Sequence, residues 1–242
     1  MNNLWTRRAL NKVGLLEPLM KLKRKFAYIE QPFMPCTPHL LIAVNKSFRL
    51  LCEKGLGEGS DYLEFGIFRG FTLWYAQQIA NDMGIRDMHF YGFDSFLGLP
   101  PLVDVDKEGG FREGAYFCSQ WQVEAYLNQY GIDWKRTFLV PGWFEKTLNE
   151  VTQKKFGMRR CSLCVIDCDL YESSRFVLNF IEPLIHKDMI VLFDDWNSYE
   201  KDPNKGERRA LREFLEQRSG IHATHLFEFG GHGQAFMLSR VR

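Results

Sequence analysis

Acidic residues follow four predicted strands of the chain, where each strand ends. The strands are short apolar runs at 61–65, 88–93, 162–166 and 189–193, and the acids at their ends are Glu64, Asp94, Asp167, Asp169, Asp194 and Asp195. Carboxylates gathered at one edge of a sheet repel one another strongly unless cations or hydroxyl donors neutralise them. One acid after a strand is a common turn signal, but four strands ending in acids predict a ligand-binding site at that edge.

Two of these acidic groups have the composition of a metal site. Asp167 and Asp169 end one strand, and Asp194 and Asp195 end the next, so the carboxylates of these neighbouring strands can converge. Carboxylate oxygens without His or Cys partners favour Mg²⁺, with Mn²⁺ or Ca²⁺ as alternatives, whereas Zn²⁺ prefers nitrogen or sulfur ligands. Adjacent aspartates are also common helix caps, but the two groups together predict a metal.

A glycine-containing turn after the first strand indicates a nucleotide site. Glu64 precedes Gly66 and Gly70, and Asp94 ends the next strand 24 residues after Gly70, near the interval at which a carboxylate holds a ribose diol. Glycines let the backbone approach a ligand closely, and the following helix offers free N–H groups. An acid before a single early glycine favours a cationic ligand that has no phosphate. The pattern therefore favours S-adenosylmethionine over NAD. Trp143, after Gly142, either frames the adenine or belongs to the core.

The cysteines invite a second metal interpretation. Cys161, Cys164 and Cys168 have C-x-x-C-x-x-x-C spacing, which is compatible with zinc. No second ligand pair stands at a suitable distance, and the segment around Cys164 has the apolar pattern of a buried strand. Because cysteine is often a small buried hydrophobe, we expect core cysteines here, and neither zinc nor disulfides.

Strands alternate with helical patterns through most of the chain, which predicts an α/β fold with a doubly wound, mostly parallel sheet. Helices are expected at 39–54, 70–83, 119–130, 143–151, 172–186 and 208–218. A further strand is expected at 137–140, and strands at 223–229 and 234–239 form a closing hairpin around Gly230 and Gly231. Residues 94–117 form a loop long enough to indicate a function. We divide the chain into an N-terminal helical extension, 1–58, and a main domain, 59–242.

The charge distribution bears on partners and location. The chain has 31 basic and 30 acidic residues, which argues against nucleic acid as a partner. Residues 1–25 contain seven basic residues against Glu17 alone. They could form a basic amphipathic helix on a membrane surface, or a solvated helix packed on the domain or on a dimer partner. There is no spanning segment and no signal peptide, so we expect a cytoplasmic protein.

Five segments in order resemble the macrocin O-methyltransferase family: residues 63–70, 93–100, 140–148, 166–173 and 193–196. The resemblance implies a seven-stranded methyltransferase fold, S-adenosylmethionine as the methyl donor, Mg²⁺, and a homo-oligomer such as a dimer. It places Glu64 and Gly66 at the methionine part of the cofactor and Asp94 at the ribose. Asp167 or Asp169 would hold the metal with the Asp194–Asp195 pair, and 101–118 would form an acceptor-binding lid.

The expected chemistry is methyl transfer to a hydroxyl of a small molecule, most simply a sugar of a natural-product glycoside or surface polysaccharide. A metal lowers the pKa of the hydroxyl, and a base accepts its proton. Asp169 is the first candidate base, with His232 and His39 as alternatives. The candidate cofactor-binding residues are Glu64, Phe65, Gly66, Gly70, Asp94, Ser95, Gly142, Trp143 and Asp167. A catechol-type methyltransferase, a non-catalytic binding module and a Rossmann dehydrogenase are the alternatives.

Overall fold

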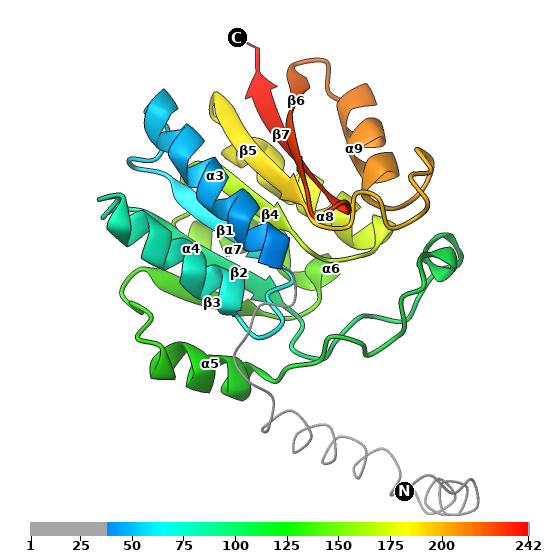
Figure 1. Cartoon of the computed structure of the whole chain (residues 1–242). Coiled ribbons are helices and arrows are strands. Elements are labelled where there is room, and N and C mark those ends of the chain that lie inside the picture. The colour runs from blue at the N-terminus through cyan, green and yellow to red at the C-terminus, as the bar shows by residue number, and fades with distance from the viewer. Residues whose placement is uncertain (1–37, 242) are drawn as a thin grey trace, which may run out of the picture.

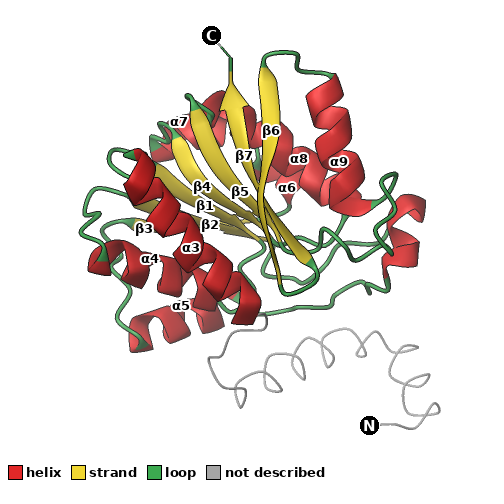
Figure 2. Ribbon diagram, turned by 45° about the horizontal axis from the view of Figure 1, so that its top comes forward, coloured by secondary structure: helices red, strands yellow, loops and turns green. Residues whose placement is uncertain are grey.

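The computed structural model describes residues 38–241, which form three layers with a sheet in the middle. Helices α3, α4 and α5 cover one face, and α6, α7, α8 and α9 cover the other (Figure 1, Figure 2). The expectations for residues 1–25 lie outside the described residues. Within the described part of the chain, no helix combines the length and the apolar character needed to cross a membrane.

The sheet has seven strands in the order β3-β2-β1-β4-β5-β7-β6. Strands β1 to β5 pair in parallel, and β7 is antiparallel both to β5 and to β6, with which it forms the closing hairpin. This confirms the predicted fold class. The strands are β1 (Asp61–Phe65), β2 (His89–Asp94), β3 (Thr137–Pro141), β4 (Cys161–Ile166), β5 (Asp188–Phe193), β6 (Ile221–Phe229) and β7 (Gly233–Arg240).

The helices follow the predicted order. They are α3 (Pro38–Lys54), α4 (Phe71–Asp82), α5 (Gln120–Gln129), α6 (Phe144–Thr147), α7 (Glu150–Phe156), α8 (Tyr171–Ile181) and α9 (Gly206–Glu216), with 3-10 turns η1 (Asp104–Gly109) and η2 (Glu182–Leu184). The single short helix predicted over 143–151 is wrong, because Asn149 starts a new helix by accepting a 3.0 Å hydrogen bond from the Thr152 amide. The helix predicted over 172–186 ends earlier, at Ile181, and the 3-10 turn η2 follows, because Pro183 has no N–H to donate.

Side chains of the central strands alternate between the two helical layers. Tyr62 and Phe90 pack among α3, α4 and α5, whereas Leu63, Phe65 and Phe93 pack towards α8. The strands are buried on both faces, which explains why they read as nearly continuous apolar runs. Helix α3, placed in the 1–58 extension, buries its apolar side in the same core as β1.

The three clustered cysteines lie in the core on the α8 side of the sheet. Burial raises the pKa of the Cys161, Cys164 and Cys168 thiols well above the ordinary value. The three thiols are thus packed as small apolar groups, and the Cys161 thiol lies 3.1 Å from the Leu163 carbonyl oxygen.

Candidate active site

The strand-end acids are aligned by hydrogen bonds that continue the sheet past its regular pairing. The amide of Asp167 donates to the Phe65 carbonyl at 2.9 Å, and the amide of Asp194 donates to the Ile166 carbonyl at 3.0 Å. These bonds bring residues beyond β1, β4 and β5 to the same level of the sheet. The chain leaves β1 for one half of the sheet and returns at β4 to build the other, so this edge is the switch point at which open α/β sheets bind ligands.

Gly66 is required by a close approach between backbone segments. A Cβ added there would lie 1.8 Å from the Asp167 carbonyl oxygen, and the residue has φ of 85°. Both the space and the left-handed conformation therefore admit only glycine. The glycine turn that predicts a nucleotide site therefore also packs directly against the backbone of Asp167.

A cavity of about 850 Å³ opens over this edge. Among the predicted site residues, those that line it are Glu64, Gly66, Asp94, Ser95, Trp143, Asp167, Asp169, Asp194, Asp195 and His232. The predicted lid also contributes; together with the two residues that lead into it, it spans 99–118, which is called the lid below, and it lines the cavity through Leu99, Val103 and Tyr116 among others. The carboxylates that the sequence places at four strand ends thus share one cavity.

Four predicted residues do not line the cavity. The side chain of Phe65 lies on the face of the sheet opposite to that of Glu64, where its ring stacks on Phe93 with centroids 4.6 Å apart. Gly70 is the N-cap of α4, and the amide of Gly142 donates to the Asp94 carbonyl at 2.9 Å. His39 is exposed and lies against Gly230 of the hairpin turn. Phe65, Gly70 and Gly142 shape the site through packing and backbone.

Glu64 is buried at the inner wall of the cavity, with 2% of its surface exposed. Tyr62, two residues earlier on the same face of β1, donates its hydroxyl to Glu64 Oε2 at 2.6 Å. Burial raises the pKa of Glu64 to about 8, the Tyr62 hydrogen bond opposes this, and the charge of Asp94 adds to it. A cationic group entering the cavity would favour the ionised form.

Asp94 is oriented by three backbone amides. Its Oδ2 accepts from the amides of Ile67 and Phe68 at 3.0 and 3.1 Å, and its Oδ1 accepts from Phe96 at 2.7 Å. Burial raises the pKa of Asp94 to about 6, and the three amides limit the rise. A carboxylate has about four lone-pair sites, so in this geometry Asp94 can accept about one further hydroxyl without moving.

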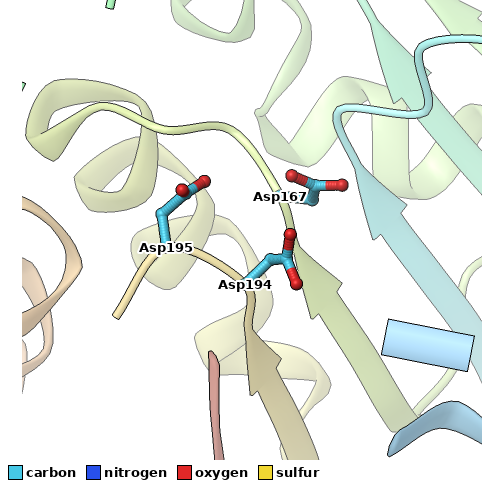
Figure 3. Close-up of side chains that lie close together, drawn as sticks. All are labelled: Asp167, Asp194 and Asp195. Atoms are coloured by element: carbon cyan, nitrogen blue, oxygen red, sulfur yellow. The ribbon is translucent and has the colours of Figure 1, made fainter. Parts of the chain in front are cut away.

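Asp167, Asp194 and Asp195 form a candidate metal site. One carboxylate oxygen from each lies within 4.8 Å of the other two. Figure 3 shows the three groups facing a common space beyond the ends of β4 and β5. Burial raises the pKa of Asp167 well above its ordinary value, and the charges of Asp194 and Asp195 raise it further. Three carboxylates that repel one another at this distance, and that offer only oxygen ligands, fit a hard divalent cation such as Mg²⁺.

Asp169 is not one of these three residues, but it lines the same cavity and the charge of Asp195 acts on its carboxyl group. Its backbone has φ of 64°, a left-handed conformation that Asp tolerates better than most residues. Only 6% of its surface is exposed. Burial raises the pKa of Asp169 well above its ordinary value, followed by the charge of Asp195. The unusual backbone aims Asp169 differently from Asp167, two residues before it.

His232 reaches the cavity from the turn between β6 and β7. The loop after β5 holds this turn in place, because the Asn197 amide donates to the His232 carbonyl at 3.0 Å. The Asn197 side chain donates to the Gly231 carbonyl, also at 3.0 Å. Arg208 of α9 in turn donates to the Trp196 carbonyl and to Asn197 Oδ1. His232 is therefore on a braced turn, although its ring is exposed.

Three functional-site residues were missed by the sequence reasoning. Tyr62 could have been found from its i, i+2 relation to Glu64 on one strand face. Asp106 and Glu207 are acids buried to 1% exposure, in the lid and at the start of α9. Burial and then the charge of Asp195 raise the pKa of Glu207 well above its ordinary value. Nothing in their local sequence distinguishes these two acids from exposed ones.

The fold and the sequence have recognisable relatives. The solved structure of the O-methyltransferase NovP matches with a TM-score of 0.69 at 20% identity, over 84% of this chain and 79% of that one, so the fold is that of class I O-methyltransferases. Residues 53–225 match the family described as macrocin-O-methyltransferase, and the chain belongs to that family.

Two curated relatives are the 8-demethyl-8-(2,3-dimethoxy-alpha-L-rhamnosyl)-tetracenomycin-C 4'-O-methyltransferase of Streptomyces olivaceus and the mycinamicin III 3''-O-methyltransferase of Micromonospora griseorubida. They are 26% and 24% identical to this chain over 172 and 174 residues, which is 67% of this chain in both cases. The matched regions span 64% and 66% of the relatives' own lengths, just under two thirds.

The raised pKa of Glu64 predicts a pH-dependent stability. The carboxyl group binds its proton more tightly in the folded protein, at a pKa of about 8 against an ordinary 4.5. Its contribution to stability is therefore fully present below about pH 4.5 and is lost as the pH rises through 8. The Gln side chain of Glu64→Gln cannot titrate. As the pH rises from about 5 to about 8 in EDTA, the Tm of the wild type should therefore fall further than that of Glu64→Gln, and the difference between the two falls should be about 2–4 °C or more. Scanning calorimetry measures the difference.

Glu58→Gln is the matched control, since Glu58 is an exposed acid shortly before the same strand. Its Tm should follow that of the wild type at each pH. Parallel curves for the wild type and Glu64→Gln would show that Glu64 is ionised throughout and would contradict the prediction.

Proposed function

We propose that this chain is a metal-dependent O-methyltransferase that transfers a methyl group from S-adenosylmethionine to a sugar hydroxyl of a small molecule. One observation carries the proposal: a single cavity joins a glycine turn flanked by Glu64 and Asp94 to a cluster of three aspartates. The first half suits a cationic nucleoside, and the second suits a divalent cation beside a hydroxyl. Family membership supports the same chemistry.

The nucleoside half is assigned to residues of β1, β2 and the turn between them. The Glu64 carboxylate would face the cofactor's ammonium group, which would favour ionisation of Glu64 despite its burial. Asp94 would accept one ribose hydroxyl at the site that its three amides leave open. Trp143 lines the same cavity and would contact the adenine.

The metal half is assigned to Asp167, Asp194 and Asp195. Mg²⁺ bound by these three carboxylates would lower the pKa of a coordinated acceptor hydroxyl and fix its orientation. The residues fit this role by their donor atoms and by their mutual repulsion, which a cation would relieve.

Asp169 is the proposed base. Bound S-adenosylmethionine would supply the methyl group and leave as S-adenosylhomocysteine, and Asp169 would take the hydroxyl proton as the carbon–oxygen bond to the acceptor forms. Its burial and its position beside the metal cluster support this role over His232, which is exposed. Apolar lid residues, including Leu99, Val103 and Tyr116, would limit the access of water to the reacting groups.

The first prediction concerns the cofactor. Calorimetric titration with S-adenosylhomocysteine should give micromolar binding to the wild type and binding at least about tenfold weaker to Asp94→Ala, because a charge-assisted hydrogen bond and the ordering of the glycine turn are lost. Asp104→Ala, which removes an exposed lid acid outside the cavity, should bind like the wild type. Absence of binding by the wild type would contradict the proposed function.

The second prediction concerns the metal. Saturating Mg²⁺ should raise the Tm of EDTA-treated wild-type protein by about 5–10 °C, because a ligand at 100 times its Kd stabilises the fold by about 2.7 kcal/mol. Asp194→Asn should lose this response. Asp188→Asn, at the opposite end of the same strand, is the control and should retain it. A wild-type protein that does not respond to Mg²⁺ or Mn²⁺ would contradict metal dependence.

The third prediction concerns the acceptor. The names of the two curated relatives specify a rhamnosyl-bearing tetracenomycin and mycinamicin III as their acceptors. We therefore expect a mass-spectrometric screen with S-adenosylmethionine and Mg²⁺ to find methylation among rhamnosides and other deoxysugar glycosides that carry vicinal hydroxyls. Surface-polysaccharide repeat units belong in the same panel. Preferential methylation of free catechols would instead establish the catechol-type alternative.

A further inference from the structure

The two ends of the lid are hydrogen-bonded to each other at its base, and its tip contacts the segments that follow β4 and β5. At its base, the Leu99 amide donates to the Ala115 carbonyl and the Gly114 amide donates to the Leu99 carbonyl, both at 2.9 Å. Its tip contains η1, which lies beside the loop before α9 (Figure 1, Figure 2). Glu108 forms an ion pair there with Lys205. The base and the tip are thus held by separate contacts.

Asp106 is the buried residue of this exposed tip. Only 1% of its surface is accessible, whereas its neighbours Val105 and Lys107 are exposed. Asp106 Oδ1 accepts from the Tyr171 amide at 2.8 Å and from the Tyr199 hydroxyl at 3.3 Å. Tyr171 is the first residue of α8, whose own N-cap residue, Leu170, offers no side-chain acceptor. The lid therefore supplies the cap that the helix lacks.

Tyr199 connects this cap to the candidate base. Its hydroxyl lies 3.4 Å from the Asp169 carbonyl oxygen as well as 3.3 Å from Asp106. Its ring is held between two glycines, one in the lid and one at the start of α9. A Cβ added at Gly109 or Gly206 would come within 2.6 or 2.5 Å of the ring. The ring is thus fixed by packing, and the hydroxyl spans the lid and the end of β4.

We propose that Asp106 is a positioning residue that couples the docking of the lid to the placement of Asp169. When the tip is docked, Asp106 caps α8, and Tyr199 holds the strained backbone of Asp169, whose φ is 64°. The acceptor-covering segment and the proposed base are thereby set in one event. The catalytic part of this inference rests on the proposed function, whereas the structural coupling does not.

Hydrogen–deuterium exchange of the full chain tests the coupling without any acceptor. In Asp106→Ala, amide exchange should be at least about tenfold faster in two separate regions, the lid at 99–118 and the segment 167–174, because a helix cap and a buried hydrogen bond are lost together. Asp106→Asn keeps an oxygen that can accept from the Tyr171 amide, so its exchange should lie closer to the wild type.

Two further variants separate the components. Asp104→Ala is the matched control, since Asp104 is in the same turn with a side chain 94% exposed, and its exchange should equal that of the wild type. Tyr199→Phe keeps the ring between the glycines but removes the hydroxyl, so exchange should rise at 167–171 more than in the lid. Faster exchange of the lid alone in Asp106→Ala would overturn the coupling.

Kinetics test whether the coupling matters for methyl transfer. With the best acceptor from the glycoside screen, Asp106→Ala should lower kcat at least about tenfold, while the Kd for S-adenosylhomocysteine changes less than about twofold. An unchanged kcat would overturn the positioning role. If the wild type neither binds S-adenosylhomocysteine nor turns over, the proposed function fails, but the exchange results still decide whether Asp106 couples the two segments.

Discussion

The concentration of negative charge at one edge of the sheet is the constraint on which the rest of the site depends. The pairing of β1, β4 and β5 brings the residues beyond these strands to one level, so their carboxyl groups are close and partly shielded from water. Burial and mutual repulsion raise the pKa of Asp167 and Asp169 alike. A fold that keeps such acids together gives up stability in exchange for a strong preference for cationic ligands.

The surrounding structure divides this charge into two environments. Glu64 and Asp94 have hydrogen-bond donors from the chain itself, namely the Tyr62 hydroxyl and three backbone amides. Asp167, Asp194 and Asp195, after β4 and β5, place one carboxylate oxygen each within 4.8 Å of the other two, and the Ser198 hydroxyl donates to Asp195 Oδ1 at 2.7 Å. The first pair is therefore suited to neutral or singly charged organic groups, and the second group to a compact cation. The two parts of the cavity differ chiefly in how closely their carboxylates converge, since the acids themselves are nearly the same.

Much of the fold could be predicted from the sequence because its signals are local. Apolar runs followed by acids marked the strands, and the closing hairpin was marked by Gly230 and Gly231. The site was predicted less completely. That Phe65 points away from the cavity follows from strand alternation, which separates it from Glu64 by one residue. Asp106 could not be found, because its partner Tyr171 is 65 positions away and no local pattern identifies a buried acid in a loop.

The sequence likewise could not decide between Asp167 and Asp169 as a metal ligand. Two residues apart would mean the same side in a regular strand, but the left-handed backbone at Asp169 breaks that alternation. Only Asp167 then groups with Asp194 and Asp195. The helix boundary at Asn149 was also missed, because it depends on the Asn149 side chain accepting from the Thr152 amide.

The way the lid is fastened has a consequence for how such a protein can diversify. Its base is closed by backbone bonds of Leu99, with Gly98 fitted against the Ala115 carbonyl, and its tip is anchored through Asp106 and Gly109. The stretch between base and anchor, which includes the cavity-lining Pro101 and Val103, contributes to neither fastening through a side chain. Substitutions in this stretch would therefore change the shape and polarity of the cavity wall while the acids at the strand ends keep their positions.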